Sequence, residues 1–107
     1  MRYLMLSKAG STPPDAKLYA DMAAFVEELT ASGVLLATGG LDPAGFKMTS
    51  EGDEITVTDG PFTEAKEAIG GFALIEVRSR EEAIELGHRF RKIVGDGESV
   101  IHQVFGP

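Results

Sequence analysis

The chain has 107 residues, of which 43% are hydrophobic and 25% charged, a composition typical of one globular domain spanning residues 1–107. It contains no cysteine, which excludes a disulfide framework and thiolate chemistry. Its net charge of −7 argues against direct nucleic-acid binding and against docking on an anionic membrane. The first residues are too short and too interrupted for a secretory signal, and no apolar run could span a membrane, so we expect a cytoplasmic protein.

The first part of the chain predicts a strand, a helix and a second strand. Residues 2–7 form a short apolar run typical of a strand. The helix is predicted to begin after an N-cap at Thr12, with Pro13 in its first position, and to end at Gly33. Residues 34–40 predict the next strand. The apolar stripe of the helix recurs at i, i+4, i+7 and i+11: Leu18, Met22, Phe25 and Leu29.

The second part predicts a hairpin, a strand, a long helix and a last strand. Residues 46–59 alternate around a turn at Gly52, which is typical of a hairpin. Residues 71–77 and 99–105 predict strands, and Ser79 with Glu82 has the spacing of a capping box that opens a helix between them. The buried stripe of this helix comprises Ala83, Leu86, Gly87, Phe90 and Val94.

The order of elements predicts an α+β fold. Two β-α-β units flank the hairpin and a short helix, which favours a ferredoxin-like β-α-β sandwich with a mainly antiparallel sheet. In the four strands of these units both alternating faces are substantially apolar, whereas two helices can cover only one face of a sheet. We therefore expect a second copy of the chain to cover the other face, giving a homodimer in the form of a dimeric α/β barrel.

Residues 58–72, TDGPFTEAKEAIGGF, support two interpretations. In the structural one, Asp59 opens a Gly-Pro turn, Thr63 caps a short helix over residues 65–70, and Gly70 ends it. In the functional one, Asp59 is a general acid or base at the mouth of a pocket, and Lys66 either holds an anionic substrate group or depresses the pKa of the acid. The residues themselves favour the structural interpretation.

The remaining polar and sulfur-containing residues predict no metal site and no cofactor. His88 is expected at a partly exposed helix position, and His102 points with Val100 and Val104 as a sheet histidine or into a pocket. The two histidines lack the spacing of a zinc site, and the glycines match no phosphate or dinucleotide fingerprint. Two further groups have structural interpretations. Three methionines are expected as core filler, with the lining of an adaptable ligand cavity as the alternative: Met5, Met22 and Met48. Five basic residues interspersed with glutamates predict a salt-bridged, exposed helix face: Arg78, Arg80, Arg89, Arg91 and Lys92.

The run TDGPFTEAKEAIGGF resembles the signature of DGPF-domain proteins in the YCII-related superfamily. The segments RYLML, ASGVLLATGGLDP, ITVTDGPF, IEVRSREEAIEL and GDGESVIHQVFGP are also similar to that family, so the resemblance covers essentially the whole chain. It implies a ferredoxin-like fold in dimeric α/β barrels, mostly without an assigned activity and often accompanying extracytoplasmic-function sigma factors. YCII-type relatives are suspected to carry a His-Asp pair in a pocket, and the first helix of this chain lacks that histidine.

The resemblance and the residues together give two hypotheses. In the first, the protein is a dimeric α/β barrel that binds a small organic molecule in a cleft between sheet and helices, with acid–base chemistry at Asp59. Its substrate contacts would be Gly60, Pro61, Phe62, Lys66 and His102. In the second, it is a non-enzymatic regulatory or interaction module linked to sigma-factor signalling. This alternative predicts a shallow or filled cavity and an exposed apolar patch outside the dimer interface.

Overall fold

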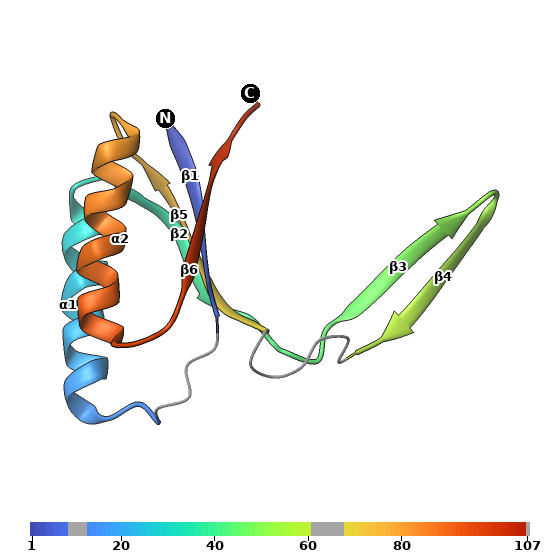
Figure 1. Cartoon of the computed structure of the whole chain (residues 1–107), viewed down its shortest axis with the longest axis horizontal. Helices are drawn as coiled ribbons and strands as arrows, with labels where there is room; N and C mark the ends of the chain where they lie inside the picture. The colour runs from blue at the N-terminus through green and yellow to red at the C-terminus, as the bar shows by residue number, and fades with distance from the viewer. Residues whose placement is uncertain (9–12, 61–67, 107) are drawn as a thin grey trace.

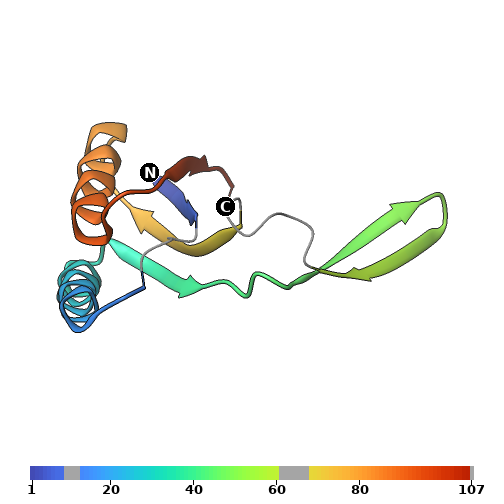
Figure 2. The same ribbon diagram turned by 60° about the horizontal axis from the view of Figure 1, so that its bottom comes forward.

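A four-stranded antiparallel sheet with two helices on one face forms the body of the molecule (Figures 1 and 2). The computed structural model describes residues 1–8, 13–60 and 68–106. The sheet has the order β2-β5-β1-β6, and each neighbouring pair is antiparallel. This is the predicted ferredoxin-like arrangement. Its elements are β1 (Arg2–Lys8), α1 (Ala16–Ala31), β2 (Leu35–Gly40), β5 (Ile69–Glu76), α2 (Arg80–Val94) and β6 (Ser99–Val104).

Local signals at both ends fix the position of α1. The N-cap is Asp15, whose carboxylate accepts a hydrogen bond of 2.8 Å from the Leu18 N–H, so the prediction of an N-cap at Thr12 is wrong. Pro14 explains the difference, because a proline disfavours helical geometry in the residue before it and the helix therefore starts beyond the Pro-Pro pair. At the other end Gly33 has a φ of 80°, as predicted for the glycine that follows a helix.

The predicted capping box lies at the start of α2, but the backbone N–H that donates to Glu82 belongs to Arg78 and not to the N-cap residue. Ser79 is the N-cap, and its hydroxyl accepts a hydrogen bond from the Glu82 N–H at 3.1 Å. The Glu82 carboxylate accepts a bond of 3.3 Å from the Arg78 N–H. The helix ends where the N–H of Gly95, with a φ of 82°, donates to the Arg91 carbonyl.

The hydrophobic core lies between the helices and the covered face of the sheet. Its buried members come from both helices and from β1 and β5: Tyr3, Met5, Phe25, Leu29, Ile75, Val77, Ala83 and Leu86. Gly87 is also buried and brings α2 close to β1 and β6 at Met5 and Ile101. The two apolar stripes predicted from the sequence therefore both face this core.

The opposite face of the sheet carries no helix among the described residues (Figure 2). Because side chains alternate along a strand, the neighbours of buried Tyr3, Met5 and Ile75 point to this open face. We call these apolar residues of β1, β5 and β6 the open sheet face: Leu4, Leu6, Phe72, Leu74, Val100 and Val104. None of them is fully buried, and the homodimer that would cover them stays a prediction.

A second, two-stranded sheet, which lies between β2 and β5 in the sequence, projects from the body (Figure 1). It is the predicted hairpin and consists of β3 (Phe46–Glu51) and β4 (Glu54–Asp59); we call it the arm. The Cα radius of gyration of 15.9 Å exceeds the roughly 13 Å expected for a compact chain of this length, because the arm extends outward. Met48 lies on the arm with 64% of its surface exposed, so its prediction as core filler is wrong.

The segment leading into β5 differs from the short helix predicted for residues 65–70. Ile69 and Gly70 already belong to β5, so the prediction that Gly70 ends a helix is wrong. Here glycine allows close pairing of strands, since a Cβ on Gly71 would lie 3.2 Å from the Gly39 carbonyl oxygen. The proposed cap Thr63 and most of that helix lie outside the described residues. In the part of the chain that is described, the helices are too short and too polar to cross a membrane.

Candidate ligand-binding cavity

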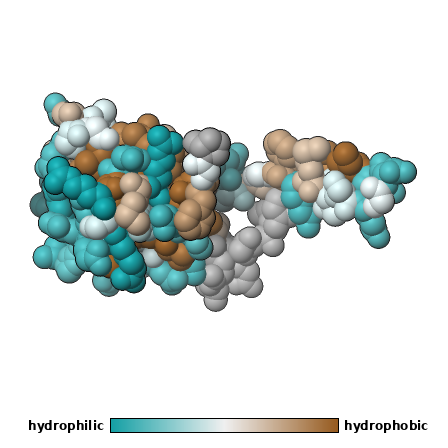
Figure 3. All heavy atoms as spheres, turned by 90° about the horizontal axis from the view of Figure 1, so that it is seen from above, coloured by the Kyte–Doolittle hydropathy of each residue, from teal (hydrophilic) through white to brown (hydrophobic). Residues whose placement is uncertain are grey.

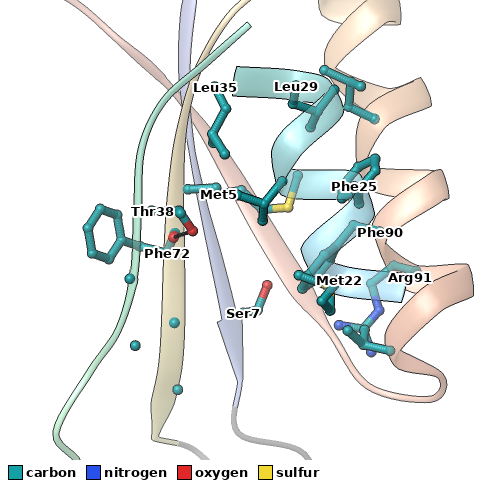
Figure 4. Close-up of a pocket in the computed structure, with 18 of the residues that line it drawn as sticks. Met5, Ser7, Met22, Phe25, Leu29, Leu35, Thr38, Phe72, Phe90 and Arg91 are labelled. Atoms are coloured by element: carbon teal, nitrogen blue, oxygen red, sulfur yellow. Dashed lines mark hydrogen bonds between the residues drawn. The ribbon is translucent and has the colours of Figure 1, made fainter. Parts of the chain in front are cut away.

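A cavity of about 570 Å³ lies between the helices and the covered face of the sheet (Figure 4). Its walls are mainly apolar, which follows from the helical stripes, because the same side chains that form the core also border this space. Leu18, Met22 and Phe25 line it from α1 and Phe90 from α2. The sheet contributes Met5, Leu35, Thr38, Ala73 and Ile75.

Glycines occupy the edge of the cavity where β2 and β5 pair. Gly39, Gly40, Gly70 and Gly71 all line it, and none has a side chain that could fill the space. Beside them the Thr38 hydroxyl donates a hydrogen bond of 2.9 Å to the Phe72 carbonyl, which leaves the oxygen free to accept another. The sequence predicts only the ends of two strands here, so it does not predict that these glycines leave additional volume in the cavity.

Polar groups gather where β1 ends, β6 begins and α2 ends. The Ser7 and Ser99 hydroxyls are hydrogen-bonded at 2.9 Å. Arg91 donates from Nη1 to the Ser99 hydroxyl at 3.3 Å and from Nη2 to the Gly95 carbonyl at 2.7 Å. Of these groups Ser7 and Arg91 line the cavity, together with Lys8 and Asp96. We call Ser7, Ser99 and Arg91 the polar end of the cavity.

Arg91 differs from the salt-bridged residue that was predicted. The structure records no ion pair between Arg91 and a described carboxylate, and two of its five N–H donors are used by Ser99 and Gly95. Lys8, in contrast, pairs with Glu98 at 3.6 Å. The sequence did hold a signal: Arg91 follows Gly87 by four residues and therefore lies on the buried stripe of α2.

Arg89 is the basic residue of α2 that does form an ion pair with the other helix. Its Nη1 and Nη2 lie 2.7 and 2.9 Å from the two carboxylate oxygens of Glu28 on α1. The hydrogen bond from Arg89 lowers the pKa of Glu28 below its ordinary value. The guanidinium also stands 4.9 Å from the centre of the Phe25 ring, so it covers the outside of the core where the two helices meet.

The residues predicted as a site are distributed over several places. Asp59 is the exposed last residue of β4, opposite Phe46, and the next N–H, of Gly60, donates to the Gly45 carbonyl at 3.0 Å. His102 lies on β6 opposite Leu4. Neither Asp59, Gly60 nor His102 is among the described residues that line the cavity. Pro61, Phe62 and Lys66 lie outside the described residues, so the roles predicted for this set stay predictions.

The comparisons with known proteins agree with this fold. The family model of the YCII-related domain matches residues 1–100, and the chain therefore belongs to the YCII-related family. It is 32% identical over 82 residues to the uncharacterized protein R00369 of Rhizobium meliloti (strain 1021). That match covers 75% of this chain and 66% of the relative, just under two thirds of the relative's length. The DGPF assignment within the family stays a prediction.

A solved structure also resembles the chain over its whole length. It is 5-chloro-2-hydroxyhydroquinone dehydrochlorinase (TftG) from Burkholderia phenoliruptrix AC1100, in complex with 2,5-dihydroxybenzoquinone. The TM-score is 0.58 at 19% sequence identity, and the match covers 100% of this chain and 96% of the other. At this identity the similarity establishes the shared fold, and the predicted ferredoxin-like fold is confirmed.

Proposed function

We propose that the protein binds a small, largely apolar organic anion in the cavity between its sheet and its helices. The observation that carries this proposal is a cavity of about 570 Å³ with apolar walls and one polar end, where Arg91 has no carboxylate partner among the described residues. The volume falls within the range of roughly 300–1,000 Å³ typical of sites for small molecules. TftG, which shares the fold, binds a hydroxylated ring compound, and this supports a ligand of similar size.

Arg91 determines the expected charge of the ligand. A guanidinium keeps its charge at any physiological pH, and it binds carboxylates and similar anions through parallel N–H groups. In a chain of net charge −7, a cation that faces an apolar cavity without a carboxylate partner is suited to an anionic ligand. Ser7 and Thr38 add hydroxyl groups that can orient polar substituents of the same molecule.

The test compares two ring compounds of similar shape and different charge. At neutral pH 2,5-dihydroxybenzoquinone is an anion, because its hydroxyl groups are vinylogous acids, whereas 2,5-dimethoxybenzoquinone is neutral. Binding of each is measured by isothermal titration calorimetry. Arg91→Met is expected to weaken binding of the anion by roughly 10- to 150-fold, the equivalent of about 1.5–3 kcal/mol for a hydrogen bond to a charged group. It should change binding of the neutral compound by less than threefold.

Lys92→Met is the matched control, because it removes the same charge from the same helical turn at an exposed position outside the cavity lining. It should leave binding of both compounds within about twofold of the original chain. An equal loss of both compounds in Arg91→Met would contradict the role of the charge. Failure of the original chain to bind either compound at millimolar concentration would contradict this ligand class.

Acid–base chemistry at Asp59 is a separate part of the proposal. It rests on the resemblance of residues 58–72 to the DGPF signature, and Asp59 lies outside the described cavity lining. We expect Asp59→Asn to abolish turnover of a bound ligand while the affinity and the oligomeric state stay unchanged. A variant that loses only stability would assign Asp59 to the turn at the base of the arm.

We also propose that the protein is a homodimer in which the open sheet faces of two copies pack together. The support is the apolar character of this face, which the helices leave uncovered. The alternative function, a regulatory or interaction module linked to sigma-factor signalling, predicts a shallow or filled cavity and an exposed apolar patch outside the dimer interface. The cavity of about 570 Å³ favours ligand binding over that alternative.

A further inference from the structure

The arm has one apolar face and one polar face. Strict alternation along β3 and β4 places four large apolar residues on one side: Phe46, Met48, Ile55 and Val57. Their exposed fractions are 68%, 64%, 63% and 58%, respectively. The cross-strand pair Met48 and Val57 is followed by the pair Thr49 and Thr56, which points to the opposite, polar side. Hydrophobic side chains are visible on the surface of the arm beyond the body (Figure 3).

Among residues 1–8, 13–60 and 68–106, nothing in the body of the chain covers this face. Every described residue of β3 and β4 is exposed, and the two strands form a sheet of their own. A two-stranded hairpin is at best marginally stable in water unless a further layer covers its apolar side. Four such side chains present on the order of 400–500 Å² of apolar surface, which lies within the roughly 300–600 Å² of the largest patch on a typical monomer, a patch that is often an interaction site. We therefore expect another molecule to cover the apolar face of the arm.

A second copy of the chain is the occupant that the exposed surfaces favour. In its described part, each copy carries two apolar surfaces that no helix covers, the arm and the open sheet face. In a two-fold dimer each copy provides one arm and receives the arm of its partner, so the same interface covers both arms. An arm of about 400–500 Å² together with part of the sheet face reaches roughly the 800 Å² that each partner buries in a stable complex.

The charges on the arm indicate which part of it is buried. Glu51, Asp53 and Glu54 stand at the tip, whereas the base carries Phe46 with a single carboxylate, Asp59, opposite it on the same face. The tip is expected to remain in solvent, because burying three unpaired carboxylates is costly. Two copies with a net charge of −7 each also repel one another, so their association should strengthen as salt is added.

We propose that the arm is a dimerisation arm whose apolar face packs against a second copy of the chain. This inference rests on the homodimer proposed above, and it assigns to β3 and β4 a role that the sheet face alone does not require. Residues Met48 and Val57 form the centre of the contact. The polar pair Thr49 and Thr56 faces solvent in both the monomer and the dimer.

Sedimentation equilibrium between about 0.1 and 100 µM tests the proposal with two matched double variants. Met48→Asp with Val57→Asp places two carboxylates on the apolar face. Thr49→Asp with Thr56→Asp places the same two charges on the neighbouring cross-strand pair of the polar face. Both variants set like charges opposite one another, and Thr49→Asp with Thr56→Asp also lies on the face of Glu51 and Glu54, so the control disturbs the hairpin by the same mechanism as the first variant. The first should raise the dimer dissociation constant at least 100-fold, and the second should change it by less than about threefold.

A second apolar-face variant distinguishes loss of the dimer contact from unfolding of the hairpin. Met48→Thr with Val57→Thr keeps residues that favour strands and removes apolar surface, and it should raise the dissociation constant at least tenfold. Circular dichroism verifies that each variant keeps the fold. If neither apolar-face variant weakens the dimer, the arm assignment is overturned.

Leu74→Glu, on the open sheet face, separates the two proposals. A dimer that dissociates with Leu74→Glu and not with the arm variants would leave the sheet-face homodimer standing and overturn the arm contact. An original chain that is monomeric at 100 µM would overturn both. Dissociation by the apolar-face variants, with the polar-face variant unaffected, supports the arm.

Discussion

Replacing Gly87 with alanine sets two effects of opposite sign against each other. Gly87 is a buried residue near the middle of α2, and exchanging glycine for alanine in a helix interior stabilises a protein by about 1 kcal/mol. The added Cβ would lie 3.2 Å from Cδ1 of Ile101 and 3.6 Å from Cε of Met5. The second distance is an ordinary van der Waals contact, whereas the first requires Ile101 to move by a few tenths of an ångström.

The surroundings of these two side chains determine the sign. Both contacts are with the ends of flexible side chains, and Met5 borders the cavity into which it can shift. Ile101 is half-buried and borders an open groove beside Gly87 and His88. A small rotation of Ile101 costs at most about 0.5 kcal/mol. We therefore expect a net gain of about 0.5 kcal/mol, which raises Tm by roughly 2–4 °C in a domain of this size.

Urea unfolding followed by circular dichroism, at one protein concentration for all variants, measures this difference. Gly95→Ala is the control, because Gly95 has a φ of 82° and no neighbouring atom within 4 Å of its added Cβ. It should lower the free energy of unfolding by about 1–3 kcal/mol through backbone strain alone. A loss of more than about 1 kcal/mol in Gly87→Ala would refute the reasoning, since it would mean that Met5 and Ile101 cannot yield.

Two further predictions concern arginines of α2. Arg89→Leu should raise the pKa of Glu28 toward its ordinary value, as measured by NMR titration; an unchanged pKa would contradict the ion pair. Because the folded-state pKa of Glu28 is lowered, its stabilising contribution is present at neutral pH and is lost as the pH falls through that pKa. Gly97→Ala, at a φ of 151°, places a Cβ in the space of the Arg91 guanidinium, and should lower the free energy of unfolding by about 1–3 kcal/mol and weaken binding of the anionic quinone. Gly45→Ala, with a φ of 47° and open space around it, should reduce stability without changing that binding.

The parts of the fold that sequence predicts well are those that depend on neighbours along the chain. The stripes of α1 and α2, the cap at Ser79 and the glycine after α1 all follow from spacings of a few residues. The error at Thr12 has the same local origin, because two candidate caps flank a Pro-Pro pair and only Asp15 is followed by a chain free to start the helix.

The candidate site depends on relations between distant residues, and sequence predicted less of it. Arg89 and Arg91 are not distinguished by the sequence of a charged helix. Arg89 donates a hydrogen bond to Glu28, 61 residues away, whereas Arg91 donates to Ser99 and Gly95. The cleft was expected between sheet and helices, but its polar end was not, because it forms only where β1, β6 and the end of α2 meet. The volume itself depends on how side chains fill space, which no periodicity records.

The position of the arm between two paired strands has a consequence for folding. β2 and β5 are antiparallel neighbours, and the pair Gly40 and Gly71 must close a loop of 30 residues, 41–70. Compared with a loop of about 4 residues this is roughly three doublings in length, which costs about 1.8 kcal/mol in closure entropy. A hairpin that forms early within the loop shortens its effective length. Where the hairpin forms after the sheet, the full loop of 30 residues slows the pairing of β2 with β5, and joining these strands by a tight turn should accelerate it.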